Sequence, residues 1–307
     1  MPAWLDTHLV SVLNGLAIGF LLFILAVGLS LVFGMMDVLN LAHGVLFLTG
    51  AYLSWLIGGP APTWPSFLLA LMAAGALGAI AGAGLSLATE RLARRTRGTP
   101  SGTERRSHLD QALLTLGVSL IAADALSAIF GDDVLAVDPP PGLDGSVMLL
   151  GHLYPVYRLA LIAAGLALAV IVHLGVERTS LGALVRATVS DREMVSAVGA
   201  DDRKIKAIVF ALGSLLATGA GVLGAPIYGA GPGLDTTVLI LALVVVVIGG
   251  LGSIRGALVG ALVIGQIETL GRSLLSDLAS FVLFGALALV LILRPQGLFG
   301  APTGAKP

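Results

Sequence analysis

Nine apolar runs, separated by short polar segments, constrain this chain more than any other feature. They fall at about 9–34, 39–57, 66–89, 111–130, 157–175, 207–228, 237–251, 254–271 and 278–293. A helix needs about 20 apolar residues to cross the roughly 30 Å hydrocarbon core of a bilayer. The chain is 57% hydrophobic and only 11% charged, whereas soluble domains carry about 25% charged residues. We therefore expect an all-α integral membrane protein with eight or nine transmembrane or re-entrant helices. Residues 1–307 should form a single transmembrane domain.

Two places in this pattern leave the number of spans open. The run at 39–57 contains the polar stretch "DVLNLAH", and the last runs before the C-terminal one are joined only by "GGLGS". Non-helical backbone is tolerated at membrane depth only where protein or a water-filled cavity surrounds it. Either place can therefore be re-entrant or broken. Nine full spans put the N-terminus outside, and one re-entrant segment puts it inside. The hydropathy also allows a repeat between 20–57 and 237–271.

The loop charges predict the orientation in the membrane. Residues 90–108 contain six arginines, and the loop at about 176–206 is also basic, so both should be cytoplasmic. The loop at 131–157 has four aspartates and no lysine or arginine, so it should face outside as irregular structure. Arg294 and Lys306 then predict a cytoplasmic C-terminus.

Five residues inside the apolar runs are candidates for lining or shaping a translocation pathway. Asn40 and His43 are three apart, so they share a helix face, and we expect them to hydrogen-bond backbone where a broken segment meets its neighbours. Gly44 would permit close packing there. Asp124 and Glu268 are charged groups within apolar runs, which usually face protein or water. For Asp124 the alternative is a hydrogen bond to a neighbouring helix, and for Glu268 it is snorkelling to the interface.

No catalytic or metal-binding pattern is present in the sequence. The five histidines are scattered without an H-E-x-x-H motif, and there is no cysteine. No "GK[ST]" of a nucleotide-binding loop occurs, so ATP hydrolysis would need another chain. The net charge of −1 gives no basic surface for nucleic acid.

The loop at about 176–206 contains a short amphipathic pattern that suits a docking helix. Asp191 and the residues after it should begin the helix, with Ser190 as N-cap. Gly199 should end it, and Asp201 and Asp202 should precede a second helix. The residues expected to contact a cytoplasmic partner are Arg192, Glu193, Met194, Val195, Ala197, Val198 and Gly199. A solvated hairpin between two spans is the alternative.

Three stretches together resemble the LivH-type permeases of branched-chain amino acid ABC importers. They are "GLSLVFGMMDVLNLAHGVLFLTGAY", "LLTLGVSLIAADALSAIFG", and "RATVSDREMVSAVGADDRKIKAIVFALGSLLATGAGVLGAPIYG" with the glycine-rich segment that follows it. The resemblance covers about 10–293. Glu193 and Gly199 match the E-x-x-x-x-x-G core of the coupling-helix motif of such permeases. The family usually has a polar or acidic residue after A-H-G, where this chain has Val45, which weakens a direct substrate-binding role there.

The resemblance implies a multi-pass permease subunit in a bacterial inner membrane, with no cofactor of its own. It implies a second, LivM-like permease or a second copy of this chain as partner. Two cytoplasmic ATPase subunits would hold ATP and Mg²⁺, and a periplasmic binding protein would deliver the substrate. The permease would move branched-chain or related amino acids by alternating access.

Several alternatives to this function stay open. A permease of the same family can carry urea, short amides or another small organic solute. An ion-coupled secondary transporter would need more intramembrane charges and would leave the docking loop without a role. A membrane-embedded enzyme would need a catalytic constellation that the sequence lacks.

Overall fold

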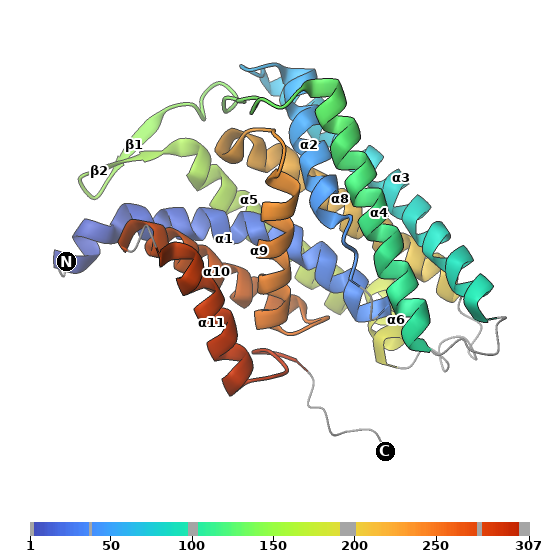
Figure 1. Ribbon diagram of the computed structural model, residues 1–307. Coiled ribbons are helices and arrows are strands. Elements are labelled where there is room, and N and C mark those ends of the chain that lie inside the picture. The colour runs from blue at the N-terminus through green and yellow to red at the C-terminus, as the bar shows by residue number, and fades with distance from the viewer. Residues whose placement is uncertain (1–2, 37–38, 98–103, 191–200, 275–277, 301–307) are drawn as a thin grey trace.

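The computed structural model describes residues 3–36, 39–97, 104–190, 201–274 and 278–300, nearly all of them helical (Figure 1). The helices are α1 (Ala3–Met36), α2 (His43–Gly58), α3 (Trp64–Arg97), α4 (Glu104–Phe130), α5 (Val156–Arg178), α6 (Ser180–Ser190), α8 (Asp202–Tyr228), α9 (Leu234–Gly249), α10 (Ile254–Leu274) and α11 (Ala279–Leu293). Six of them contain stretches long and apolar enough to cross a membrane, and three shorter ones are also apolar. The prediction of an all-α membrane protein is confirmed.

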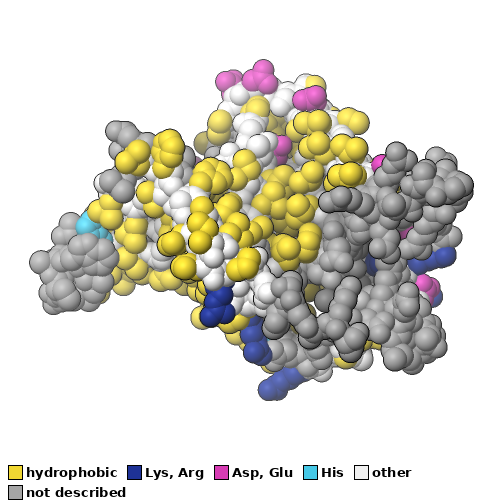
Figure 2. Space-filling view, turned by 60° about the horizontal axis from the view of Figure 1, so that its bottom comes forward, with side chains coloured by type: hydrophobic (Ala, Val, Ile, Leu, Met, Phe, Trp, Pro, Cys, Tyr) yellow, Lys and Arg dark blue, Asp and Glu magenta, His cyan; other side chains and the backbone are white. Residues whose placement is uncertain are grey.

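The molecule has two chemically different ends. The ends of α3 and α5 and the start of α8 lie at one end, which we call the basic end. The loop 131–155 and the start of α1 lie at the other, which we call the hairpin end. On the face seen in Figure 2, acidic side chains gather mainly at the top and Lys and Arg at the bottom, with hydrophobic side chains between them. This is the pattern expected of a protein whose apolar middle lies in a bilayer.

Helix α1 is the centre of the core. In an 18-residue apolar window of this helix, 78% of the residues are buried within the protein, and the helix packs against α10, α8, α5 and α9. A helix that is apolar on all sides is expected to be surrounded by other helices or by lipid. By contrast, only 11% of the residues are buried in the corresponding windows of α4 and α5. Their outer faces therefore remain free for lipid or for another subunit.

The run at 39–57 is a broken span. Helix α1 ends at the basic end, and α2 begins only at His43, beside Leu25 of α1. Leu25 lies 11 residues before the end of α1, which is roughly 16 Å of helix. Helix α2 therefore starts about half-way along α1 and runs from there to the hairpin end. The run at 237–271 is two helices, α9 and α10, joined by a tight turn that includes Gly252 (φ +77°).

The chain halves α1–α4 and α8–α11 are related as an inverted repeat. Both begin with a long helix followed by a 16-residue helix, α2 or α9, and α1 and α8 run in opposite directions. The packing is also reciprocal, because α1 lies along α10 while α3 lies along α8. Hydropathy pairs 20–57 with 237–271, but the structure pairs 3–58 with 202–249. The hydropathy thus matches α1 and α2 with α9 and α10, one helix later than the structural match with α8 and α9. The reason is that α9 and α10 are also two apolar helices joined by a glycine-rich turn.

The loop 131–155, which the sequence predicts to be irregular, contains a small β-hairpin. Strands β1 (Ser146–Leu149) and β2 (His152–Pro155) pair antiparallel, with Leu149 opposite His152. The turn places Leu150 at φ +52° and Gly151 at φ +90°, the combination of two positive φ angles that suits a two-residue hairpin. The many prolines and glycines around it favour irregular structure and conceal this short pairing.

Candidate translocation site

The start of α2 is a buried, hydrogen-bonded break in the apolar interior. The Asn40 side chain is 2% exposed, and its Oδ1 accepts a hydrogen bond from the Ala42 N–H at 3.2 Å. The Leu41 N–H donates to Thr115 Oγ1 of α4 at 3.2 Å. Backbone groups that have left a helix inside a membrane must find such partners. Asn40 therefore closes the break locally, as predicted from its position.

His43 connects this break to α1. Its ring is fully buried, and Nε2 lies 2.9 Å from the Leu25 carbonyl oxygen. A carbonyl only accepts, so Nε2 carries the proton and Nδ1 is the bare nitrogen. Among the residues that the structure describes, Nδ1 has no hydrogen-bond partner. The expected hydrogen bond from His43 to exposed backbone is confirmed, and it uses a carbonyl of a neighbouring helix.

Gly44 is where the two short helices meet. A side chain at this position would overlap the Asp235 carbonyl oxygen of α9 and would lie 2.9 Å from Leu239 Cβ. The N-terminal turns of α2 and α9 therefore touch through backbone atoms, at equivalent points of the inverted repeat. The prediction that Gly44 allows close packing is confirmed.

Asp235 belongs to this meeting point and was not predicted. It lies in the first turn of α9 and is 9% exposed. An acidic residue in the first turn is favoured by the helix dipole. The sequence "GPGLD" contains the signal, because it places an acid directly after a turn, at the start of an apolar helix.

Helices α2 and α8 cross at glycine contacts. A Cβ on Gly50 would overlap the Thr218 carbonyl oxygen, and one on Gly221 would overlap the Phe47 carbonyl oxygen. Small residues at helix interfaces let backbones approach this closely in membranes. The broken segment is thus held rigidly against α8, the helix that leads from the basic end.

Glycines of α10 are used for packing as well. Gly256 and Gly260 face the backbone of α9, and Gly265 faces the backbone of α1 at Gly15 and Gly19. Close packing, rather than a pathway lining, accounts for these glycines. On the same helix, Gln266 Nε2 donates to the Val12 carbonyl oxygen of α1 at 2.9 Å.

Glu268 lies inside the protein near the hairpin end. It is 8% exposed, and its Oε1 accepts from Arg272 Nη2 at 2.7 Å. It therefore does not snorkel to the interface. It is also far from the broken segment, because Gln266 lies beside Val12 of α1 whereas His43 lies beside Leu25. Thirteen helical residues correspond to roughly 20 Å.

Asp124 lies apart from both groups. It occupies the exposed side of α4, while Ala122, Ala123 and Leu126 turn inward to the core. No hydrogen bond or ion pair joins it to other described residues, so the alternative of a hydrogen bond to a neighbouring helix is not found. A charged group on an otherwise apolar span almost always faces protein or water. The side of α4 that carries Asp124 is therefore suited to contact something other than lipid.

The basic end holds the entry to α8 through polar contacts. A second helix was expected after Asp201 and Asp202, and α8 begins one residue earlier, at Asp202. Asp201 caps it, since its Oδ1 accepts from the Arg203 and Lys204 N–H groups at 3.1 and 3.4 Å. Arg203 Nε also pairs with Glu90 Oε1 of α3 at 2.7 Å. This pair, which the sequence did not reveal, joins the start of α8 to the end of α3. The predicted docking residues, Arg192 to Gly199, lie outside the described residues.

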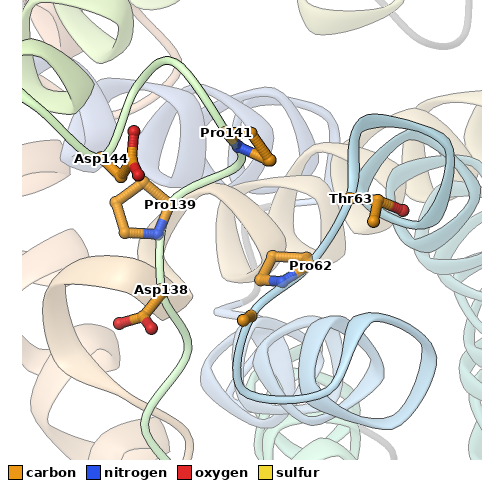
Figure 3. A pocket seen from close by; sticks show the side chains of 7 residues that line it. Pro62, Thr63, Asp138, Pro139, Pro141 and Asp144 are labelled. Carbon is orange, nitrogen blue, oxygen red and sulfur yellow. The ribbon is translucent and has the colours of Figure 1, made fainter.

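An open cleft of about 390 Å³ marks the hairpin end. It lies between the loop from α2 to α3 and the loop after α4 (Figure 3). Its walls carry Asp138 and Asp144 among prolines, and the two loops are held together by backbone and side-chain hydrogen bonds. The Asp138 N–H donates to the Pro60 carbonyl oxygen at 2.7 Å, and Trp64 Nε1 donates to that of Pro141 at 2.9 Å. The cleft is therefore a firm, acidic surface.

Comparison with known proteins matches the whole length of this architecture. The family model of the branched-chain amino acid transport system, permease component, matches residues 11–293. BraD of Pseudomonas aeruginosa, a high-affinity branched-chain amino acid transport system permease protein, is 28% identical over 97% of this chain and 98% of its own. The permease protein LivH is 29% identical in Escherichia coli K12, over 95% of this chain and 96% of its own. LivH of Salmonella typhimurium is 28% identical with the same coverage.

No solved structure matches the chain. The family match nevertheless includes the broken span, the short helices α2 and α9, and the start of α8. The relatives are named as transport permeases and not as enzymes. The chain therefore belongs to the family of permease components of branched-chain amino acid transport systems.

Proposed function

We propose that this chain is the membrane-spanning permease subunit of an ABC importer for branched-chain or related amino acids. The observation that carries the proposal is the family match over residues 11–293, which leaves almost no part of the chain outside the permease. The substrate class follows from the branched-chain amino acid transport systems for which BraD and LivH are named. The chain itself performs no covalent chemistry in this role.

The proposed partners follow from the subunit organisation of ABC importers. Two ATPase subunits bind the cytoplasmic side, where Arg192 to Gly199 dock and where ATP and Mg²⁺ are held by the ATPases. A second, LivM-like permease or a second copy of this chain completes the pathway. The poorly buried outer faces of α4 and α5 support such a contact, as does exposed Asp124. A periplasmic binding protein docks at the hairpin end.

The path from ATPase to pathway runs through α8. This helix begins directly after the docking segment, is attached to α3 by the Arg203–Glu90 pair, and crosses α2 at Gly50. A displacement of its first turn therefore reaches the broken span without passing through flexible side chains. Alternating access needs an element with two arrangements that partners bind differently. The half-length helices α2 and α9 suit that element. In this orientation the basic end and the C-terminus are cytoplasmic.

Uptake by the reconstituted importer tests the proposal. The chain is co-expressed with its neighbouring permease, ATPase and binding-protein genes, purified and placed in liposomes with ATP inside. We expect ATP-dependent uptake of leucine, isoleucine or valine that requires the binding protein. Uptake of urea or short amides instead would assign the alternative substrate class. Gradient-driven uptake by the chain alone, without ATPases, would contradict the proposal.

Two variants test the docking segment. Glu193→Lys and Gly199→Pro should each reduce co-purification of the ATPases while the permease still inserts and purifies. Ser180→Ala, at the start of α6 before the segment, is the control. Normal ATPase binding and uptake in both variants would show that the docking helix lies elsewhere.

A further inference from the structure

Polar and charged groups from four helices converge inside the hairpin end. They are Asn14 of α1, Arg158 of α5, Tyr228 of α8, and Glu268 and Arg272 of α10. Arg158 donates a hydrogen bond to Asn14 Oδ1. The Tyr228 hydroxyl lies close enough to the charges of Glu268, Arg272 and Arg158 to interact with them electrostatically. We call these five residues the outer polar cluster. Such groups within spans are costly and mark candidate functional sites.

Glu268 retains an unused acceptor in this cluster. Its Oε1 is engaged by Arg272, but Oε2 is buried and has no partner among the described residues. The buried Tyr228 hydroxyl is likewise without one. A buried polar atom without a partner destabilises the fold, and more strongly when it is charged. A ligand that donates hydrogen bonds, such as an ammonium group, would satisfy both oxygens.

Arg158 retains an unneutralised charge. Its guanidinium contacts the neutral amide of Asn14, and within the described parts of the chain it pairs with no carboxylate. It lies in the first turn of α5 and is half-buried. Tyr154, just before it, does not supply a negative charge, because burial raises the pKa of its hydroxyl to about 12. A planar guanidinium in this position is suited to a carboxylate.

We propose that the outer polar cluster is a binding station for the zwitterionic head of an α-amino acid. Arg158 takes the carboxylate, and Glu268 Oε2 with the Tyr228 hydroxyl takes the ammonium group. This inference rests on the proposed function, because it assumes an amino-acid substrate. It adds the residues that recognise the backbone of the substrate, whatever its side chain. The station is placed within the outer part of the bundle, where substrate released at the hairpin end arrives first.

The arrangement also explains why both signs of charge are present. The Glu268–Arg272 pair alone is neutral, so the cluster with Arg158 carries one net positive charge. A substrate with only a carboxylate would meet Glu268 unfavourably, and one with only an amine would meet Arg158 unfavourably. A zwitterion satisfies both, and an uncharged amide such as urea satisfies neither fully.

Binding of three probes to the purified permease–ATPase complex, without binding protein, tests the inference. The probes are leucine, 4-methylpentanoate, which lacks the amine, and 3-methylbutylamine, which lacks the carboxylate. Saturation-transfer NMR measures the binding of each. The intact complex should bind leucine more tightly than either analogue. Glu268→Gln should weaken leucine binding by about tenfold to a hundredfold and leave the binding of 4-methylpentanoate unchanged. Arg158→Gln should weaken leucine binding by a similar factor and leave the binding of 3-methylbutylamine unchanged. Arg158→Lys should retain part of the leucine binding.

Controls separate binding from folding. Arg178→Gln removes the same charge from the other end of α5 and should leave leucine binding unchanged. An equal loss of all three probes in the Glu268 and Arg158 variants would indicate a purely structural ion network and overturn the inference. Absence of leucine binding to the intact complex would also overturn it. Neither result would touch the proposed function, which is decided separately by ATP-dependent uptake with the binding protein.

Discussion

Gly44 of α2 lies against the main-chain carbonyl of Asp235 of α9, with no space for a side chain between them. This contact joins the first turns of the two 16-residue helices that correspond to each other in the inverted repeat. Each of these helices begins after a non-helical segment and ends at a glycine cap, Gly59 or Gly250. The two halves of the chain are thus fastened to each other at their most irregular points.

Adding a single methyl group at this contact should destabilise the permease. In Gly44→Ala the new Cβ overlaps the Asp235 carbonyl oxygen, and overpacking of this kind costs about 1–3 kcal/mol. Gly84→Ala on α3 is the matched control, because nothing lies within 4 Å of a Cβ there. Thermal unfolding in detergent should show a lower midpoint for Gly44→Ala only. An equal midpoint for both variants would contradict the close contact.

Removal of the His43 ring should loosen the start of α2. His43→Ala leaves the Leu25 carbonyl without its second donor and opens a cavity, at a cost of about 0.5–1.5 kcal/mol for the lost hydrogen bond alone. His43→Gln keeps an N–H donor and should recover part of the stability. Hydrogen exchange of residues 43–50 measures the effect. The hydrogen-bond assignment fails if Ala and Gln behave alike.

The Glu90–Arg203 pair should affect coupling more than stability. Glu90 is 24% and Arg203 61% exposed in their side chains, and exposed pairs contribute at most about 1 kcal/mol. Glu90→Arg and Arg203→Glu should each lower uptake per ATP hydrolysed by at most about fivefold. The charge-swapped double variant should recover it. Lack of recovery would mean that the two residues act independently.

The acidic cleft at the hairpin end should attract the binding protein electrostatically. Asp138→Asn with Asp144→Asn should lower the association rate and weaken its dependence on salt, because surface charges mainly steer encounter. Biolayer interferometry with the reconstituted permease measures both quantities. Asp110→Asn, near the start of α4 and away from this face, is the control. An unchanged salt dependence would place the docking surface elsewhere.

The spans could be predicted from the sequence because apolar length alone decides whether a helix enters a bilayer. Asn40 and His43 could also be assigned correctly, since polar groups beside a broken segment must hydrogen-bond backbone. The cap at Asp201 follows from a local rule as well. In each case the relevant partner lies near in sequence or is the backbone itself.

The pairings between distant elements could not be predicted. Nothing near Glu90 indicates that it meets Arg203, and nothing near Gly44 indicates Asp235, because these contacts depend on how the two halves pack. The hydropathy profile also places the second half of the repeat one helix too late. It reflects the apolar length of each helix, and not the direction in which the helix crosses the bundle. The inward turn of Glu268 and the outward turn of Asp124 depend on helix rotation, which charge content does not define.

The Leu41–Thr115 hydrogen bond has a consequence for how the protein is made. The backbone of residues 39–42 depends partly on α4 for its partners, and α4 begins at Glu104, long after α2 has left the ribosome. Helix α2, with 16 residues, is also shorter than the span of a bilayer. The packing of this segment is therefore completed only after α4 has been synthesised.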